Sequence, residues 1–271
     1  GRLDKLPSIP ETYWVLTRAI EDPSARTDDI ARIVQRDPAM CAKVLQLVNS
    51  AYFGLARPVS SVAQAITFLG LDLLKGLALT LNVFATTEAT APEGISYEKI
   101  QHMSMLTAKL AKQMAPDPKE AEAAFTAGLI HDVGLIILAL SMPDRVTEVF
   151  KVSAATGRPA HEVELELLGA THAEVGGYLL GVWGLPLPIV EAVAYHHALP
   201  STPRERMDAA MAVYVADALA DGAFAEAAGR PQVDLPNLAA VLEPTGKAGD
   251  LPRWRELAAR EARAILARQE H

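Results

Sequence analysis

An adjacent histidine and aspartate, His131 and Asp132, lie inside the otherwise apolar stretch LIHDVGLIIL at residues 129–138. Moving a charge from water into an apolar interior costs several kcal/mol unless the charge is paired or bound to a metal ion. We therefore expect this pair to have partners elsewhere in the chain. The residue three positions after the aspartate is Leu135, and not a charged residue.

Further histidines at apolar or helical positions are candidates for these partners. Imidazole nitrogens and carboxylate oxygens are ligands that iron, manganese, zinc and nickel accept. The pattern therefore favours a divalent metal centre, made with Asp132 and Asp217, over a purely structural hydrogen-bonded cluster. His161 and His271 sit in a polar loop and at the terminus, and we expect no such role for them. The five candidate histidines are His102, His131, His172, His196 and His197.

The elements that position these residues are predicted to be helices throughout. Patterns typical of strands are scarce, whereas apolar residues recur at intervals of three and four. Asp37-Pro38, Ser61 and the capping box Thr171 to Glu174 mark helix starts, and Gly70 is expected to end a helix in the left-handed conformation. Helices are expected over 38–48, 61–69, 73–85, 97–113, 121–140, 144–155, 189–197 and 204–220, from 172 onward, and from 251 to the end.

The chain is predicted to form two helical lobes. The clearest break in composition is at residues 86–96, so we place an N-terminal helical lobe at 1–91 and a second lobe, with a C-terminal helical extension, at 92–271. The sequence begins with Gly1 and not with methionine, which indicates an expression scar or a fragment of a longer protein.

The composition limits which partners and which cellular compartment are expected. The net charge is -8 and basic residues are interspersed with acidic ones, so nucleic acid is not an expected partner. The single cysteine, Cys41, lies among apolar residues and is expected in the core of a protein from a reducing compartment, so we expect a cytoplasmic location. No apolar run is expected to span a membrane, and GRLDKLPSIP has no signal-peptide pattern.

Three segments resemble the HD-related output domain (HDOD) family of bacterial signalling proteins. They are DPAMCAKVLQLVNSAYFG (37–54) with the following PVSSVAQAITFLG, then HDVGLIIL, and THAEVGGYLLGVWGLPLPIVEAVAYHH (171–197). In the expected order they cover roughly residues 6 to 200. The resemblance implies one all-helical HDOD module whose second lobe is related to the HD-domain metal-dependent phosphohydrolases and the HD-GYP phosphodiesterases.

The resemblance also implies a ligand set for one or two metal ions. The first ion would be bound by His102, by the pair His131 and Asp132, and by Asp217, whereas His172, His196, His197 and Glu98 would bind a second. Asp221 lies four residues beyond Asp217 on the same helix face and is an alternative ligand. Glu98 shares a helix face with His102, but it could instead be a solvated acid of a first helical turn.

Hydrolysis of a phosphoester needs a metal-bound hydroxide and positive groups near the phosphoryl oxygens. The hydrolytic relatives carry a lysine three residues after the aspartate, at the position of Leu135. The GYP element is also incomplete, because Val175 to Tyr178 lacks the proline, and its glycines are better explained by close helix packing.

Our leading hypothesis is therefore a signalling output module, part of a response-regulator-like protein, that acts on a protein partner. The rival is a metal-dependent phosphohydrolase or cyclic-dinucleotide phosphodiesterase that uses His131 and Asp132 on a small phosphorylated ligand. A third reading is that the histidines only stabilise the core. For Asn49 to Gly54 we favour a left-handed helix end with aromatics that pack the lobes together, over a partner surface.

Overall fold

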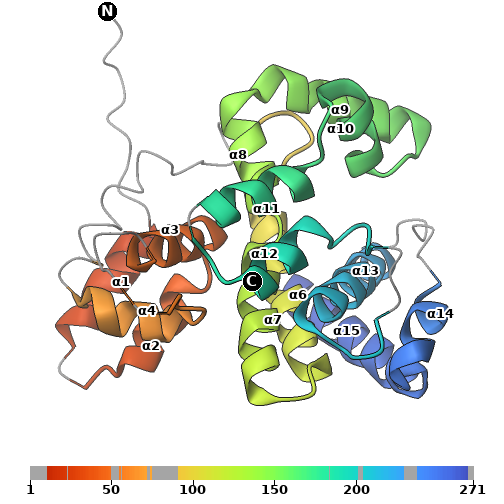
Figure 1. Ribbon diagram of the computed structural model, residues 1–271. Helices are drawn as coiled ribbons and strands as arrows, with labels where there is room; N and C mark the ends of the chain where they lie inside the picture. The colour runs from red at the N-terminus through yellow and green to blue at the C-terminus, as the bar shows by residue number, and fades with distance from the viewer. Residues whose placement is uncertain are drawn as a thin grey trace, which may run out of the picture.

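The computed structural model describes residues 11–22, 24–49, 55, 57–71, 74, 91–182, 184–200, 204–228 and 237–267. Within these ranges the regular structure consists of α-helices and short 3₁₀ helices, without strands, so the predicted all-α fold is confirmed. Figure 1 shows the N-terminal helices gathered on one side of the remaining helices, in agreement with two helical lobes. The predicted break at 86–96 falls largely on residues outside the described ranges, so the boundary itself stays a prediction.

The N-terminal lobe begins with four helices, and the starts of the third and fourth follow the predicted signals. Asp37 accepts a hydrogen bond from the backbone N–H of Met40, and Ser61 accepts one from that of Gln64. A side-chain oxygen at this position satisfies a donor that the helix leaves free. The helices are α1 (Glu11–Glu21), α2 (Thr27–Val34), α3 (Pro38–Val48) and α4 (Val62–Leu69).

Two predicted helix ends differ in detail. Gly70 has φ 76° but ψ 161°, so it has the positive φ that favours glycine without being in the left-handed helical region. Asn49 has φ -87°, so the predicted left-handed end is wrong. Its side chain instead bonds both backbone groups of Val59, at 2.7 and 2.9 Å, and ties the end of α3 to the following loop. Residues 50–54 of the same motif, and nearly all of the helix predicted at 73–85, lie outside the described residues.

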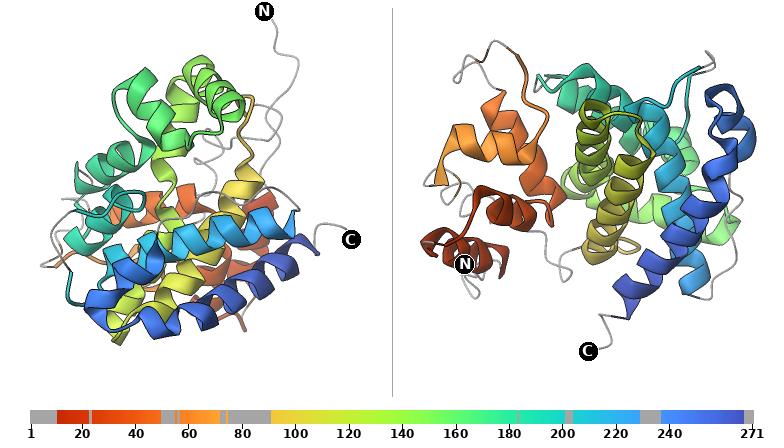
Figure 2. Two further views of the ribbon diagram at one scale, coloured as in Figure 1. Left: turned by 90° about the vertical axis from the view of Figure 1, so that its right-hand side faces the viewer. Right: turned by 90° about the horizontal axis from the view of Figure 1, so that it is seen from below.

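The second lobe is built on α6, α7 and α13, which pack against one another, with α15 covering α13 and α6 and with α11 and α12 on another side. The helices α9 and α10 pack on each other and project at one end (Figures 1 and 2). The helices are α6 (Tyr97–Met114), α7 (Pro118–Ile130), α8 (Val133–Ser141), α9 (Pro143–Thr156), α10 (Ala160–Leu168), α11 (His172–Val182), α12 (Leu187–Ala194), α13 (Ala209–Ala227), α14 (Leu238–Leu242) and α15 (Leu251–Leu266).

The single helix predicted over 121–140 is two helices. The chain turns at His131 and Asp132, so that α7 ends before the pair and α8 begins after it. The sequence did not indicate this break, because the stretch is mostly apolar and has no proline at the turn. Contacts with distant residues, such as the one between His131 and Asp217, hold the turn instead. The pair therefore lies at a helix junction and not in the middle of a helix.

Other differences concern α10, α12 and α13. Residues 160–168 form α10, which the sequence did not predict, so the loop assigned to His161 is wrong. Helix α12 ends three residues earlier than predicted, where the His196 ring lies 2.7 Å from the Val193 carbonyl oxygen. Helix α13 starts later because Asp208 caps it, accepting from the N–H of Met211.

Glycines bring the helices of the second lobe into close contact. A Cβ at Gly134 of α8 would overlap the carbonyl oxygen of His172 in α11, and one at Gly177 would lie 2.6 Å from the Cβ of Ala194. A Cβ at Gly128 would lie 2.6 Å from the Cα of Ala108 in α6. Close packing, predicted for the glycines near Tyr178, is confirmed for Gly177.

One described stretch, Pro118–Ser141, has the length and apolar composition of a membrane-spanning helix, contrary to the expectation that no apolar run is long enough. Its most apolar window is 72% buried inside the protein, and the turn at His131 and Asp132 interrupts it. Burial of this kind is typical of a core helix. Cys41 is also buried, as predicted, with its sulfur 3.3 Å from the carbonyl oxygen of Val34.

Candidate metal centre

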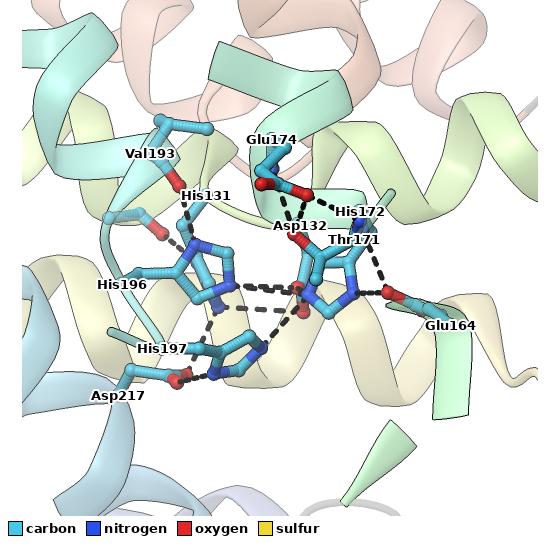
Figure 3. A network of polar contacts seen from close by, with 11 residues as sticks. His131, Asp132, Glu164, Thr171, His172, Glu174, Val193, His196, His197 and Asp217 are labelled. Atoms are coloured by element: carbon cyan, nitrogen blue, oxygen red, sulfur yellow. Dashed lines mark hydrogen bonds and ion pairs between the residues drawn. The ribbon is translucent and has the colours of Figure 1, made fainter. Parts of the chain in front are cut away.

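Asp132 lies at the centre of a cluster of histidines. Its Oδ2 is 3.4 Å from Nε2 of His131, and its Oδ1 is 3.3 Å from Nε2 of His172 and 3.8 Å from Nε2 of His196. Figure 3 shows these side chains converging from the α7–α8 turn, the start of α11 and the segment after α12. One carboxylate therefore faces three imidazoles.

A second carboxylate closes the other side of the cluster. Asp217, from α13, has Oδ1 3.2 Å from Nε2 of His131 and Oδ2 3.6 Å from Nδ1 of His197. These contacts favour Asp217 over Asp221 as the predicted aspartate ligand. The long helix α13 thus brings a residue from far along the chain to the turn at His131.

The outer nitrogens of three histidines are held by fixed acceptors. Nδ1 of His131 lies 2.9 Å from the carbonyl oxygen of Gly128, and Nδ1 of His196 lies 2.7 Å from that of Val193. Nδ1 of His172 lies 2.7 Å from Oε2 of Glu164, which also accepts from the backbone N–H of His172. Each Nδ1 must therefore carry a proton, which turns the Nε2 lone pairs toward the cluster.

These lone pairs face one another at short distances. Nε2 of His172 is 3.3 Å from Nε2 of His196 and 3.0 Å from Nε2 of His197. Because His172 and His196 donate through Nδ1, each has only a lone pair at Nε2 while it is neutral, so their contact is repulsive unless a proton or a metal ion lies between them. The arrangement calls for positive charge at its centre.

In the metal-free protein, protons supply that charge. Burial alone would lower the pKa of His131 and of His172, but the carboxylates of Asp132, Asp217 and Glu164 outweigh it and raise these pKa values to about 9 and about 10. Burial would raise the pKa of Asp132, but the neighbouring histidines hold it well below its usual range. The two charged imidazoles occupy the place where a cation is needed.

The two remaining histidines are kept neutral. Burial, followed by the charges on His131 and His172, lowers the pKa of His196 to about 4. Burial and the neighbouring imidazoles hold the pKa of His197 well below its ordinary value. Neutral imidazoles of this kind are ready to act as metal ligands without losing a proton.

The donors form two overlapping groups of potential metal ligands. One group is His172, His196 and His197, and the other is His131, Asp132 and His196, with the ligand atoms within 4.8 Å of one another in each group. Several imidazoles with carboxylates suit iron, manganese, zinc or nickel. The donor set therefore fits a divalent transition-metal ion, and the sharing of His196 leaves room for one or two ions.

The structure brings together six of the eight predicted ligands. Glu98 and His102 lie in α6, outside the two groups, and the role of all eight residues as metal ligands stays a prediction. The six that meet are His131, Asp132, His172, His196, His197 and Asp217.

Two residues of α10 contact the cluster although their sequence pattern did not predict it. Glu164 is 1% exposed, and its carboxylate hydrogen-bonds to His172. A glutamate in a stretch with other acidic residues is usually on the surface, so the sequence offers no reason to expect this. The ring of His161 stacks on that of His197, with centroids 4.2 Å apart and planes at 18°. The only signal in the sequence was their spacing of three, which puts both on one helix face.

Leu135 does not face the cluster as a missing lysine would. It is buried in a separate apolar cluster of the second lobe with Ile100, Leu138 and Val146. Among the described residues, no lysine or arginine forms an ion pair or a hydrogen bond with the six clustered ligands. The described part of the site therefore gathers candidate metal ligands without a paired lysine or arginine.

Comparison with known proteins places the chain in a family. The HDOD domain family model matches residues 6–199, so the chain belongs to the HDOD family, as its sequence resemblance implied. A protein of Treponema pallidum (strain Nichols), described as uncharacterized, is 27% identical over 205 residues, which cover 75% of this chain and 40% of that protein. The chain thus spans less than half the length of that relative.

Solved structures share the fold. The MmoQ response regulator from Methylococcus capsulatus str. Bath is 27% identical, with a TM-score of 0.70 over 93% of this chain and 98% of that chain. A virulence factor from Campylobacter jejuni subsp. jejuni is 20% identical, with a TM-score of 0.68 over 96% of this chain and 94% of that chain. At that identity the second likeness concerns the fold alone.

Proposed function

We propose that this chain is a bacterial signal-transduction output module that holds one or two divalent transition-metal ions and passes an upstream input to a protein partner. Membership of the HDOD family and the likeness to a response regulator support the signalling role. We place the module, with lobes at 1–91 and 92–271, in the cytoplasm as part of a longer regulatory protein.

The proposed metal site rests on one observation. The nitrogen atoms of four imidazoles and the oxygen atoms of two carboxylates converge on one region. His131, Asp132, His172, His196, His197 and Asp217 would hold the ion or ions. A bound ion would supply positive charge and Lewis acidity at this point. The chain's own residues bind and orient: backbone carbonyls and Glu164 fix the rings, and burial keeps bulk water from the inner imidazoles.

A signalling role is favoured over efficient hydrolysis because, among the described residues, no lysine or arginine forms an ion pair with the clustered ligands that could bring it to a phosphoryl group. Leu135 is packed in an apolar cluster at the position where hydrolytic relatives have lysine. Loss of one group that stabilises charge in a transition state commonly costs about two to three orders of magnitude in rate. A metal centre of this kind is better suited to stabilise or switch the fold.

The second candidate is a metal-dependent phosphohydrolase or cyclic-dinucleotide phosphodiesterase, and the gathered ligand set favours it. His131 and Asp132 would lie at its catalytic centre, and a small phosphorylated compound would be its substrate. In that case Asp132→Ala would abolish turnover.

One pair of experiments separates the two candidates. Metal-loaded protein is assayed against phosphomonoesters, nucleotides and cyclic dinucleotides, and the full-length protein is used to capture partners from its native cells. We expect no turnover that depends on Asp132, and we expect a retained partner that a folded variant with a disrupted metal site captures less well. Turnover that disappears in Asp132→Ala, with no retained partner, would establish the enzyme instead.

A further inference from the structure

Helix α10 has an unusual distribution of burial. Its two buried side chains are Val163 and Glu164, whereas Leu165 is 54% exposed. Burial of a carboxylate costs free energy unless its oxygens are hydrogen-bonded or paired with a charge. Exposure of a leucine loses the favourable free energy that burial of its side chain would give. The packing of α10 therefore does not explain why its glutamate faces inward.

The contacts of Glu164 do explain it. Its Oε2 lies 2.7 Å from both the backbone nitrogen and the Nδ1 of His172, the first residue of α11. The carboxylate meets the ring at the nitrogen opposite to the one that faces the cluster (Figure 3). A carboxylate in this position fixes both the orientation of a metal-binding imidazole and the place of its proton.

One turn earlier, His161 acts on a second histidine. Its ring stacks nearly parallel on His197, with centroids 4.2 Å apart. His197 is the most exposed of the clustered histidines, with 25% of its side chain accessible, and it follows the end of α12 in an irregular segment. The stacked ring limits the rotation of the most exposed side chain in the cluster.

We propose that α10 is the positioning element of the metal centre, with Glu164 orienting His172 through Nδ1 and His161 orienting His197 by stacking. Both oriented histidines belong to the same group of potential ligands, with His196 as its third member. The inference rests on the proposed metal site and adds two residues to it that act through the ligands. Helix α10 contacts mainly α9 and the start of α11. One helix at the edge of the lobe would therefore position two of the proposed ligands.

The test compares substitutions that remove each contact with substitutions that keep it. Glu164→Ala removes the acceptor, whereas Glu164→Gln keeps an acceptor oxygen without the charge. His161→Ala removes the stacked ring, whereas His161→Phe keeps the ring without its nitrogens. Glu174→Gln is the matched control, because Glu174 caps the same helix start through Thr171 and is exposed.

Zinc affinity, measured by competition with a chromophoric chelator, is the first readout. We expect Glu164→Ala and His161→Ala each to weaken binding by about 10-fold to 100-fold, and Glu174→Gln to leave it unchanged. His161→Phe should recover most of the loss, and Glu164→Gln should lie between alanine and wild type. Alanine variants that bind as wild type would overturn the proposal, as would a phenylalanine variant as weak as His161→Ala.

The ring ¹H–¹³C resonances of His172 and His197 in the metal-free protein are the second readout. We expect Glu164→Ala to shift or broaden those of His172, and His161→Ala to do so for His197, with the control unchanged. If the wild-type protein binds no zinc, the proposed metal site is wrong. These resonances then test by themselves whether α10 positions His172 and His197. Unchanged resonances in both alanine variants would then reject it.

Discussion

Nε2 of His197 lies 3.0 Å from Nε2 of His172, although Nδ1 of each ring is directed at a carboxylate, Asp217 for the first and Glu164 for the second. Because Glu164 holds the Nδ1 proton of His172, a neutral His172 can only accept at Nε2, so this contact needs a proton on one of the two Nε2 atoms. A proton resolves the conflict in the metal-free protein, and a metal ion would resolve it when bound. Competition between protons and metal therefore follows directly from the geometry.

Metal binding should release protons. With pKa values of about 9 for His131 and about 10 for His172, both rings are charged at pH 7 and must lose a proton to become ligands. We expect about one proton released when an ion fills one ligand group and about two when both groups are filled, with an affinity that rises with pH between 6.5 and 8.5. Calorimetry in two buffers of different ionisation enthalpy measures this number. Binding without proton release would contradict the assigned protonation.

The stability of the metal-free protein should fall in alkali. The pKa values of His131 and His172 are raised by folding, so their contribution is complete below the unfolded pKa of about 6.5 and is lost as pH rises through 9 and 10. We expect the free energy of unfolding in chelator to fall by an amount on the order of a few kcal/mol between pH 7 and 9.5.

Asp132→Asn provides the comparison for this pH dependence, because it removes a charge that raises both pKa values. Its urea unfolding should change less over the same range. His196 does not complicate the comparison, because its pKa is lowered to about 4 and its effect falls below pH 6.5. Equal slopes in the two proteins would show that the charged pair is not the cause.

How much of this could be predicted from the sequence depends on where the signals lie. Asp37, Ser61 and the capping box from Thr171 to Glu174 act within one helical turn, so the helix starts they mark were predicted correctly. The turn at His131 was missed, because its cause includes a contact with Asp217 in a distant helix.

Helix α10 and its contribution to the site were missed for a related reason. Its sequence, AHEVELELL, alternates acids with apolar residues and lacks a capping side chain, so no helical stripe is evident. The resemblance to a family supplied six residues that the structure brings together. It did not supply Glu164 or His161, because their importance lies in contacts with His172 and His197 from other elements.

Gly134→Ala should damage both the fold and the site. A Cβ there would overlap the backbone of His172 and lie 2.7 Å from the nitrogen of Gly176, so α8 and α11 would have to separate. Overpacking of this kind commonly costs about 1 to 3 kcal/mol. Thermal or urea unfolding, followed by zinc titration of the folded protein, measures both effects. Gly249→Ala, which meets open space, should change neither, and an equally mild Gly134→Ala would refute the packing argument.

Leu135→Lys should destabilise the protein and should not create a hydrolase. Leu135 is 8% exposed within an apolar cluster, so a lysine would bring a charge into that packing. We expect a loss of about 2 kcal/mol or more in the free energy of unfolding, compared with less than about 1.5 kcal/mol for Leu135→Met. A stable lysine variant that hydrolyses phosphoesters would show instead that one residue separates this chain from an enzyme.

Metal analysis of the purified protein tests the central claim most directly. The protein is prepared without chelator and without nickel resin, and its metal content per chain is measured beside that of Asp132→Ala, His131→Ala and the control Glu174→Gln. We predict one or two divalent transition-metal ions per chain in wild type and control, and a clear loss in the other two variants. Wild-type protein without stoichiometric metal, together with unchanged folding of His131→Ala, would contradict the metal centre.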